Sequence, residues 1–345
     1  MAINLQFDRI KMRVWTALRK CGAKRLIDNV WNIQPIILMY HRFSEHPTLG
    51  KVSRDELRSQ LAFLHSKCNV ISLEELYRGL TEGVSWKTST VAVTVDDGYQ
   101  DVYDVGFPAF MEFDIPASLF VVTDFVSGRM WHWPDKIRYI LSTTCKSSIE
   151  IEDAAGSTCI FIDSPEAIDS AWNHICDRCF MQSEAVRVET IASLAKSAGV
   201  RIPQEPPAGA RPVTWSALNE MKSSGIYIGS HGVSHRRFTS LSTDDAVKEL
   251  VKSKYELEDR LQIPVDTFAY PYGAVQDQPE GVGNLVKGAG YKMACVAYFD
   301  DSLLDDFYAV RRFGVGYDYW DFIKAADGLK RVSTVVKSRI KRQVP

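Results

Sequence analysis

The chain has no long apolar run, and this absence limits how it can meet a membrane. No stretch of about eighteen apolar residues occurs, so the sequence predicts no membrane-spanning helix. Basic and polar residues around Trp15 interrupt any apolar region of the signal-peptide type, which favours a cytoplasmic location. Net charge is also small, and a value of -2 argues against a general nucleic-acid binder.

Cysteines are few and odd in number. The seven are spread from Cys21 to Cys295, which is typical of reduced thiols rather than of a disulfide framework. Cys176 and Cys179 have the spacing of a redox or zinc pair, but no second pair accompanies them. A structural role on a helix is therefore favoured for both.

Both ends of the chain carry basic, partly apolar segments. Residues 10–31 alternate Arg and Lys with apolar side chains such as Trp15 and Leu18, which is the pattern of a basic amphipathic helix. Such a helix can lie on an anionic membrane surface or pack on the domain, and residues 330–342 pose the same choice. We expect the segments 1–33 and 326–345 to flank the main domain.

Between these ends, short apolar runs alternate with helical patterns. A capping pair, Ser53 with Glu56, predicts the start of one helix. Regular alternation of this kind indicates parallel strands joined by crossover helices, so we expect an α/β fold. The expected architecture is a closed or nearly closed barrel of about seven strands, formed by residues 34–123 and 213–325. The expected strands are 36–40, 69–71, 91–95, 117–122, 226–229, 267–270, 293–298 and 308–310, and further helices are expected from Leu73 and over 101–113, 216–223 and 243–261.

A long interruption, 124–212, contains no clear barrel unit. Its sequence predicts a hairpin, in which strands 149–152 and 158–162 flank 154–156, and it ends in a segment rich in Pro and Gly. Insertions of this length are usually functional or form a subdomain. The segment is interpreted as a lid beside the active-site mouth, with a subdomain that serves stability alone as the alternative.

Two adjacent carboxylates, Asp96 and Asp97, follow the buried strand 91–95. Two negative charges at the rim of a core are costly without a nearby cation, and a metal ion would supply that charge. The plain alternative is a turn, since Asp and Gly are common turn formers. A second motif changes the balance: His231 and His235 are four residues apart, and two imidazoles with one carboxylate can bind a metal and leave a position for water.

Three motifs together resemble one known family. They are Thr94-Val95-Asp96-Asp97-Gly98-Tyr99, Ser230-His231 through His235, and Phe268-Ala269-Tyr270-Pro271-Tyr272-Gly273. The sequence resembles the polysaccharide deacetylases, the NodB-homology group also called carbohydrate esterase family 4, over 35–319 apart from the insertion. This resemblance implies a deformed barrel that removes acetyl groups from N-acetylated sugars.

The resemblance also implies roles for single residues. Asp97, His231 and His235 would hold a divalent metal, Zn²⁺ or another transition ion such as Co²⁺ or Ni²⁺. Asp96 would be the general base that activates water, and the backbone N–H of Tyr272 would help to hold the oxyanion.

The chain departs from the family pattern at two positions. No histidine follows His235, so we expect His41, at the end of the first strand, to act as the general acid, as in circularly permuted relatives. A packed histidine is the alternative. Ala269 stands where the family commonly has an arginine that steadies the catalytic aspartate, and Arg312 or Arg42 is expected to supply that cation.

Aromatic side chains are candidates for sugar binding, because sugars stack on aromatic rings. Those nearest the inferred mouth are Tyr99, Trp131, Trp133, Trp215 and Tyr272. The sequence thus predicts a cytoplasmic, metal-dependent N-deacetylase of a polysaccharide, oligosaccharide or lipid-linked glycan precursor. Peripheral contact with the inner membrane surface is a further expectation. The alternatives are a glycan-binding pseudoenzyme and a hydrolase of C–N bonds in small metabolites on a similar barrel.

Overall fold

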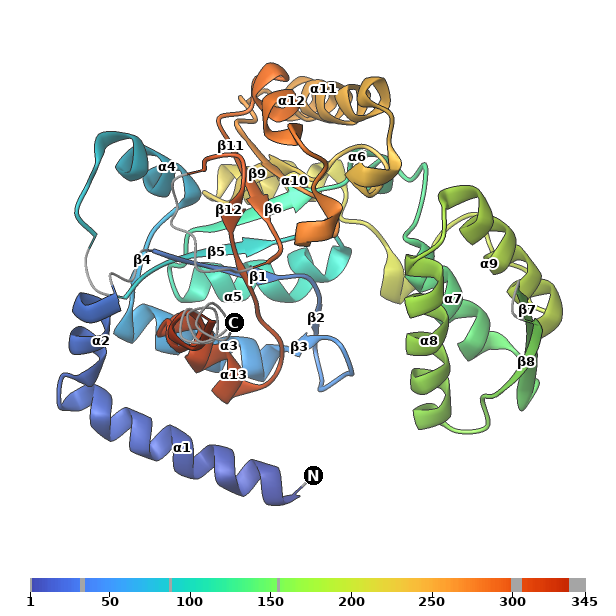
Figure 1. Cartoon of the computed structure of the whole chain (residues 1–345), viewed down its shortest axis with the longest axis horizontal. Helices are drawn as coiled ribbons and strands as arrows, with labels where there is room; N and C mark the ends of the chain where they lie inside the picture. The colour runs from blue at the N-terminus through green and yellow to red at the C-terminus, as the bar shows by residue number, and fades with distance from the viewer. Residues whose placement is uncertain (1, 32–34, 87–88, 154–155, 299–305, 335–345) are drawn as a thin grey trace, which may run out of the picture. The chain divides into compact units, whose positions relative to one another are not determined.

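The computed structural model describes residues 2–31, 35–86, 89–153, 156–298 and 306–334. Contacts divide the chain into two compact units, which we name the barrel unit, Met1–Val126 with Val213–Pro345, and the inserted unit, Ser127–Pro212 (Figure 1). Each has a hydrophobic core of its own. The candidate site lies entirely within the barrel unit.

The barrel unit is built around one sheet of parallel strands. Within the described residues, eight strands follow the order β12-β11-β10-β9-β6-β5-β1-β13, and β4 pairs beside β5. Most of these strands are wholly buried, which their runs of Val, Ile, Leu and Ala allow. The strands are β1 Ile36–Tyr40, β4 Asn69–Val70, β5 Thr90–Val95, β6 Ala117–Val121, β9 Tyr227–Ser230, β10 Thr267–Ala269, β11 Met293–Val296, β12 Val310–Arg311 and β13 Phe313–Gly314.

A single residue joins the two ends of this sheet. β12 pairs with β11 at one end of the strand order, while β13 pairs with β1 at the other. Only Arg312 separates β12 from β13. The sheet is therefore a nearly closed barrel, which confirms the predicted fold class. The last expected strand, 308–310, begins later than predicted.

Helices cross between successive strands, as parallel pairing requires. Predicted caps are present: Ser53 Oγ accepts from the N–H of Glu56, whose carboxylate accepts from the N–H of Ser53. The helices of the barrel unit beyond the N-terminal pair are α3 Arg54–Lys67, α4 Leu73–Glu82, α5 Phe107–Glu112, α6 Thr123–Val126, α10 Trp215–Ser223, α11 Thr243–Leu261, α12 Val282–Gly288 and α13 Tyr319–Ala326. Short 3-10 turns lie at Phe238–Ser240 and Val275–Asp277, and β2 Phe43–Ser44 pairs with β3 Val52–Ser53.

One helix differs from its prediction. In place of a continuous α-helix over 101–113, a π-helix, Val102–Gly106, precedes α5. Pro108 lies in the first turn of α5, where its missing N–H and its ring oppose a preceding α-helical turn. The widened π turn accommodates this proline.

The N-terminal segment forms two helices rather than one. α1, Ala2–Lys20, and α2, Ala23–Trp31, are separated at Gly22, which has a φ of 88°. None of the described helices combines the length and the apolar character that a membrane crossing needs. At the other end, the structure describes the chain only to residue 334, so most of the basic segment 330–342 lies outside the described residues.

The inserted unit consists of three helices and a hairpin. These are α7 Trp133–Thr143, α8 Pro165–Phe180 and α9 Glu184–Ala198, with β7 Ser148–Asp153 antiparallel to β8 Gly156–Phe161. Residues 154–155 of the predicted hairpin lie outside the described residues. Cys176 and Cys179 lie on α8, and burial raises the pKa of both thiols. This agrees with a structural role, because thiols of high pKa are inert. The role of a lid stays a prediction.

Candidate metal and catalytic site

The two aspartates differ in backbone conformation. Asp96 extends the β5 pattern, since its N–H donates to the carbonyl of Tyr40 at 3.0 Å. Asp97 turns away with a φ of 78°, a left-handed conformation that a non-glycine residue seldom adopts. Gly98 follows at a φ of 85°, and a Cβ there would lie 2.9 Å from Val121 Cγ1. The left-handed turn therefore separates the directions of the two carboxylates, and only glycine fits after it.

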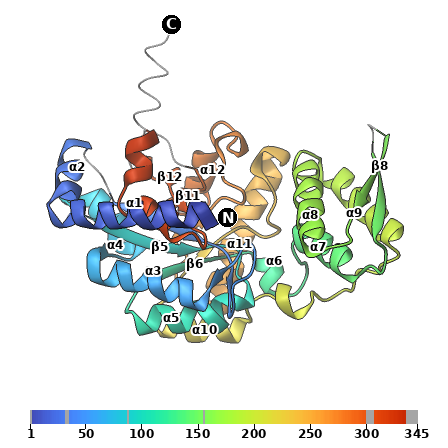
Figure 2. The same cartoon turned by 90° about the horizontal axis from the view of Figure 1, so that it is seen from below.

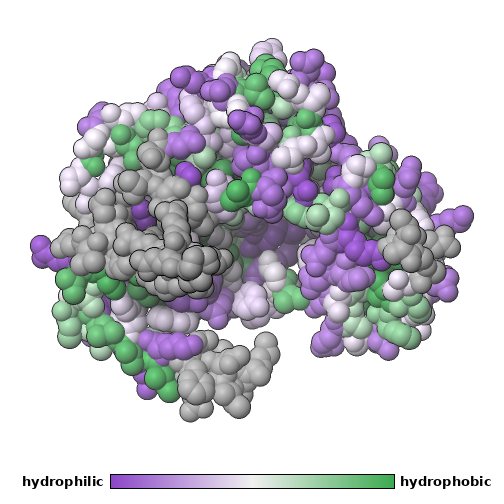
Figure 3. Space-filling view, in the orientation of Figure 1, coloured by the Kyte–Doolittle hydropathy of each residue, from purple (hydrophilic) through white to green (hydrophobic). Residues whose placement is uncertain are grey.

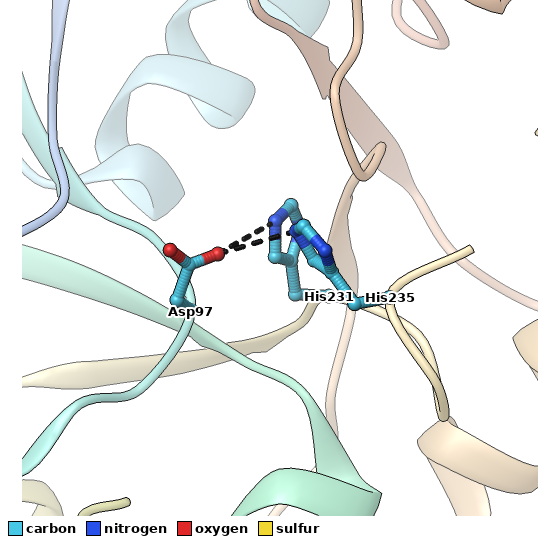
Figure 4. Close-up of side chains that lie close together, drawn as sticks. All are labelled: Asp97, His231 and His235. Atoms are coloured by element: carbon cyan, nitrogen blue, oxygen red, sulfur yellow. Dashed lines mark ion pairs between the residues drawn. The ribbon is translucent and has the colours of Figure 1, made fainter. Parts of the chain in front are cut away.

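Asp97 faces both motif histidines. Its Oδ1 is 3.5 Å from Nε2 of His231 and 3.3 Å from Nε2 of His235. One ligand atom from each residue lies within 4.8 Å of the others. Figure 4 shows both imidazoles facing the carboxylate. One carboxylate oxygen and two imidazole nitrogens form a donor set that suits a divalent transition ion, so these residues fit a metal.

A backbone carbonyl fixes the tautomer of His231. Its Nδ1 lies 2.7 Å from the carbonyl oxygen of Ala269. A carbonyl can only accept a hydrogen bond, so Nδ1 carries a proton and Nε2 is the ring nitrogen that faces Asp97. Metal-binding histidines are commonly oriented in this way. Ala269 thus contributes to the site through its backbone.

Glu249 holds the loop between the two histidines. This largely buried carboxylate on α11 accepts from the N–H groups of Val233 at 2.7 Å and Ser234 at 3.0 Å, and from Ser234 Oγ at 2.5 Å. Three hydrogen bonds from one loop restrict how His231 and His235 can move apart. The sequence analysis missed Glu249, which lies on α11, outside the three motifs. Its only sequence signal is an acidic residue at a buried position of an amphipathic helix.

Asp96 forms a buried, bidentate ion pair with Arg312. Nη1 and Nη2 of Arg312 each donate to one Asp96 oxygen at 2.7 Å, and the two side chains are 0% and 3% exposed. Arg312 Nε donates to the carbonyl of Val296 and Nη1 also to Thr94 Oγ1. Arg312 therefore supplies the cation that Ala269 cannot, one of the two possibilities that the sequence left open. Arg42, the other, pairs with Asp101 instead at 2.8 Å.

The electrostatics of the site follow from burial and this pair. Burial alone would raise the pKa of Asp96, but Arg312, with His231 and His41, lowers it below its usual value. Burial opposes the charged form of His231, yet the Asp97 and Asp96 carboxylates raise its pKa. Burial prevails at His235 and lowers its pKa. Asp96 is therefore an ionised carboxylate at neutral pH, as a general base must be.

Tyr272 borders the site in a strained conformation. Its φ is 64°, and its ring centroid lies 5.0 Å from that of His235. The guanidinium of Arg237 lies 5.5 Å from the Tyr272 ring and pairs with buried Asp277 at 3.0 Å. Left-handed φ values at Asp97, His235 and Tyr272 concentrate strain at this site, as is common where function fixes a geometry. The oxyanion role of the Tyr272 N–H stays a prediction.

His41 follows β1 directly and is exposed. It is near enough to influence both Asp96 and His235 electrostatically, which places it at the same end of the barrel. Its role as general acid and the circular permutation behind that role are untested and stay predictions.

The predicted aromatic platforms have different surroundings. Tyr99 is only 6% exposed, with the Arg42 guanidinium 3.6 Å from its ring centroid and Phe125 against it at 5.0 Å, so its ring is packed rather than open. Trp215 is half-buried at the start of α10, with Arg260 5.5 Å from its ring. Trp131 and Trp133 belong to the inserted unit. Their sugar-binding roles stay predictions.

The fold and the site together define an α/β barrel protein with a candidate divalent-metal centre. The model of the polysaccharide deacetylase family matches residues 179–294, which include both histidines and Tyr272 but not the two aspartates. Residues 179–294 therefore resemble the polysaccharide deacetylase family in sequence, and the chain shares its barrel fold with several solved structures. No curated protein matches the chain.

Solved structures share the fold at low sequence identity. The Streptococcus pyogenes deacetylase PplD, in complex with acetate, has 17% identity and a TM-score of 0.55, with 87% of this chain and 98% of that chain covered. IcaB from Ammonifex degensii has 17% identity and a TM-score of 0.54, with 85% and 96% covered. A de-N-acetylase from Aggregatibacter actinomycetemcomitans has 16% identity and a TM-score of 0.53, with 85% and 99% covered.

Proposed function

We propose that this protein is a metal-dependent hydrolase that removes the acetyl group from an N-acetylated sugar. The observation that carries the proposal is the pairing of two differently held carboxylates: Asp96, kept ionised by Arg312, and Asp97, placed against His231 and His235. Asp96 is therefore not needed as a metal ligand and can act as a base. Hydrolysis of an amide needs such a division between a base and a site for an electrophilic ion.

Asp97, His231 and His235 would hold the ion, for which we propose Zn²⁺, with Co²⁺ or Ni²⁺ as substitutes. When bound, a divalent ion at this position supplies Lewis-acid chemistry that polarises the amide carbonyl and acidifies water. Two sets of hydrogen bonds orient the ligand atoms before the ion binds: that from Nδ1 of His231 to a backbone carbonyl, and those from the 231–235 loop to Glu249.

Asp96 would accept the proton of the attacking water. Arg312 keeps this carboxylate ionised and fixes the plane of its two oxygens, so that the base is ready without reorganisation. The Tyr272 N–H would donate to the oxyanion as the carbonyl carbon becomes tetrahedral. Because an amine leaves poorly unless protonated, His41 would donate a proton to the leaving nitrogen.

The substrate class that we propose is a polysaccharide, an oligosaccharide or a lipid-linked glycan precursor. The proposed reaction is supported by the structurally similar Streptococcus pyogenes protein, which is a deacetylase in complex with acetate. We propose a cytoplasmic location. It follows from the sequence, whose odd number of scattered cysteines, seven, is typical of reduced thiols.

The test is acetate release from a panel of N-acetylated oligosaccharides by the full chain loaded with Zn²⁺ or Co²⁺. We expect release that stops with a chelator and falls at least about a thousandfold in Asp96→Asn, because the base is then lost. A glycan-binding pseudoenzyme would bind the panel without releasing acetate. A hydrolase of small C–N substrates would leave the panel intact and cleave simple amides or ureides instead.

A further inference from the structure

Helix α1 is fixed to the barrel unit by one of its faces. Trp15 is 8% exposed, and its indole N–H donates to Asp327 Oδ2 at 2.7 Å. Arg19, one turn later, donates through Nε to Asp327 Oδ1 at 3.2 Å. Asp327 caps the C-terminal end of α13 and is fully buried. The helix therefore has a defined docked face. Its hydrogen bonds join residues near the start of the chain, Trp15 and Arg19, to Asp327 near the end.

A second face of α1 is apolar and exposed. Ile10, Val14 and Leu18 are 53%, 54% and 47% exposed. Residues four apart lie on the same side of a helix, so these three side chains form one line, which we name the apolar stripe. Leu26 on α2 is 65% exposed as well. Figure 3 shows hydrophobic side chains gathered over α1, and Figure 2, which looks from below, shows this helix in front of the sheet.

Only cations accompany the stripe. Residues 10–27 contain six Lys and Arg and no Asp or Glu, although the whole chain has a net charge of -2. Of the six, Lys11, Arg13, Lys20 and Arg25 are exposed. The charge of this surface is thus opposite in sign to that of the chain as a whole.

We propose that the apolar stripe and its surrounding cations form a docking surface for an anionic membrane. Aliphatic side chains on a helical stretch, residues 10–20 of α1, whose charged side chains are all positive match a helix lying in the interface of a bilayer with anionic headgroups. A second copy of the chain fits poorly, because two such surfaces would bring like charges together. The two alternatives for the N-terminal segment are then combined: one face packs on the domain and the other meets the membrane.

The docked end of α1 lies away from the metal site. Arg19 Nη2 donates to the carbonyl of Lys67 at 2.9 Å and to Ser89 Oγ at 3.5 Å. Ser89 directly precedes β5, whereas Asp96 and Asp97 directly follow it. The two features therefore lie at opposite ends of a strand, and membrane contact through α1 leaves the site end of the barrel accessible. Activity on a soluble substrate should accordingly be unchanged by vesicles.

The test is co-sedimentation of the full chain with vesicles of phosphatidylcholine alone or with about 30% phosphatidylglycerol. We expect binding to the anionic vesicles only, weakened by salt. The double variant Val14→Asp/Leu18→Asp should bind at least about tenfold more weakly, since it places charge where apolar contact is needed. Val251→Asp, at a valine of α11 with a similar exposure of 46%, is the matched control and should bind as the wild type does.

A second variant tests the charge without touching the stripe. Arg13→Glu/Lys20→Glu should also lose binding, and the binding that remains should no longer depend on salt. Equal binding to both vesicle types, or equal binding by Val14→Asp/Leu18→Asp and the wild type, would overturn the proposal. Light scattering that shows a wild-type dimer, converted to a monomer by Val14→Asp/Leu18→Asp, would assign the stripe to a second copy instead.

Discussion

The buried pair between Arg312 and Asp96 gives the sharpest prediction. The variant Arg312→Met keeps much of the side-chain volume but removes two hydrogen bonds of 2.7 Å and the positive charge opposite Asp96. Breaking one partner of a buried ion pair typically costs about 3–5 kcal/mol, because the remaining charge stays desolvated. We expect a loss of this size in the free energy of unfolding at pH 7.

The same loss should depend on pH. In the wild type the pKa of Asp96 is lowered, so the pair stabilises the fold above the unfolded pKa of about 3.9, and this stability is lost as pH falls through the folded value. In Arg312→Met the guanidinium that lowers the Asp96 pKa is gone, so burial raises this pKa above its unfolded value. The variant therefore loses stability as pH rises through the unfolded and then the folded pKa of Asp96. The difference between the two proteins should therefore grow from about pH 4 to pH 7.

Urea denaturation of metal-free protein at several pH values between about 4.5 and 7.5 measures this difference. Arg312→Lys is the matched control, because it keeps the charge but loses the bidentate geometry. Its loss in free energy of unfolding should be smaller and should vary less with pH than that of Arg312→Met. A deficit in Arg312→Met that is the same at the lowest and highest pH would refute the reasoning, because it would reflect lost packing alone.

Other consequences concern the ligand loop and the acid. Glu249→Ala should weaken Zn²⁺ binding by about 10–100-fold in a calorimetric titration, with Glu249→Gln in between, because the loop that aims the two imidazoles loses its acceptor; an unchanged affinity would show that the loop is rigid without it. His41→Ala should lose the basic limb of the pH profile of kcat/KM along with most of the rate, and retention of both would exclude His41 as the acid.

The barrel and the ligand set could be predicted because each depends on local signals. Strand ends were marked by apolar runs that stop at polar residues, as at Tyr40 and Val95, and parallel pairing brings such ends to one edge. Asp97, His231 and His235 were identified as ligands by the resemblance of their motifs to the deacetylase family, and the structure places them within reach of one ion.

The supporting residues could not be predicted in the same way. Arg312 and Arg42 were equivalent on the sequence, since the choice between them depends on how the last strands close the barrel around one residue. Glu249 could not be predicted because no spacing or periodicity in the sequence indicates that its side chain accepts hydrogen bonds from the 231–235 loop. Tyr99 was a candidate sugar platform because it is near the inferred mouth, but Arg42 and Phe125 pack against its ring.

The central claim is that side chains from two distant motifs bind one metal ion. Elemental analysis of purified wild-type protein, His231→Ala and His235→Ala, after equal exposure to Zn²⁺ and removal of the excess, tests it most directly. The account predicts one ion per chain in the wild type and close to none in either variant. Wild-type stoichiometry in both variants would contradict it.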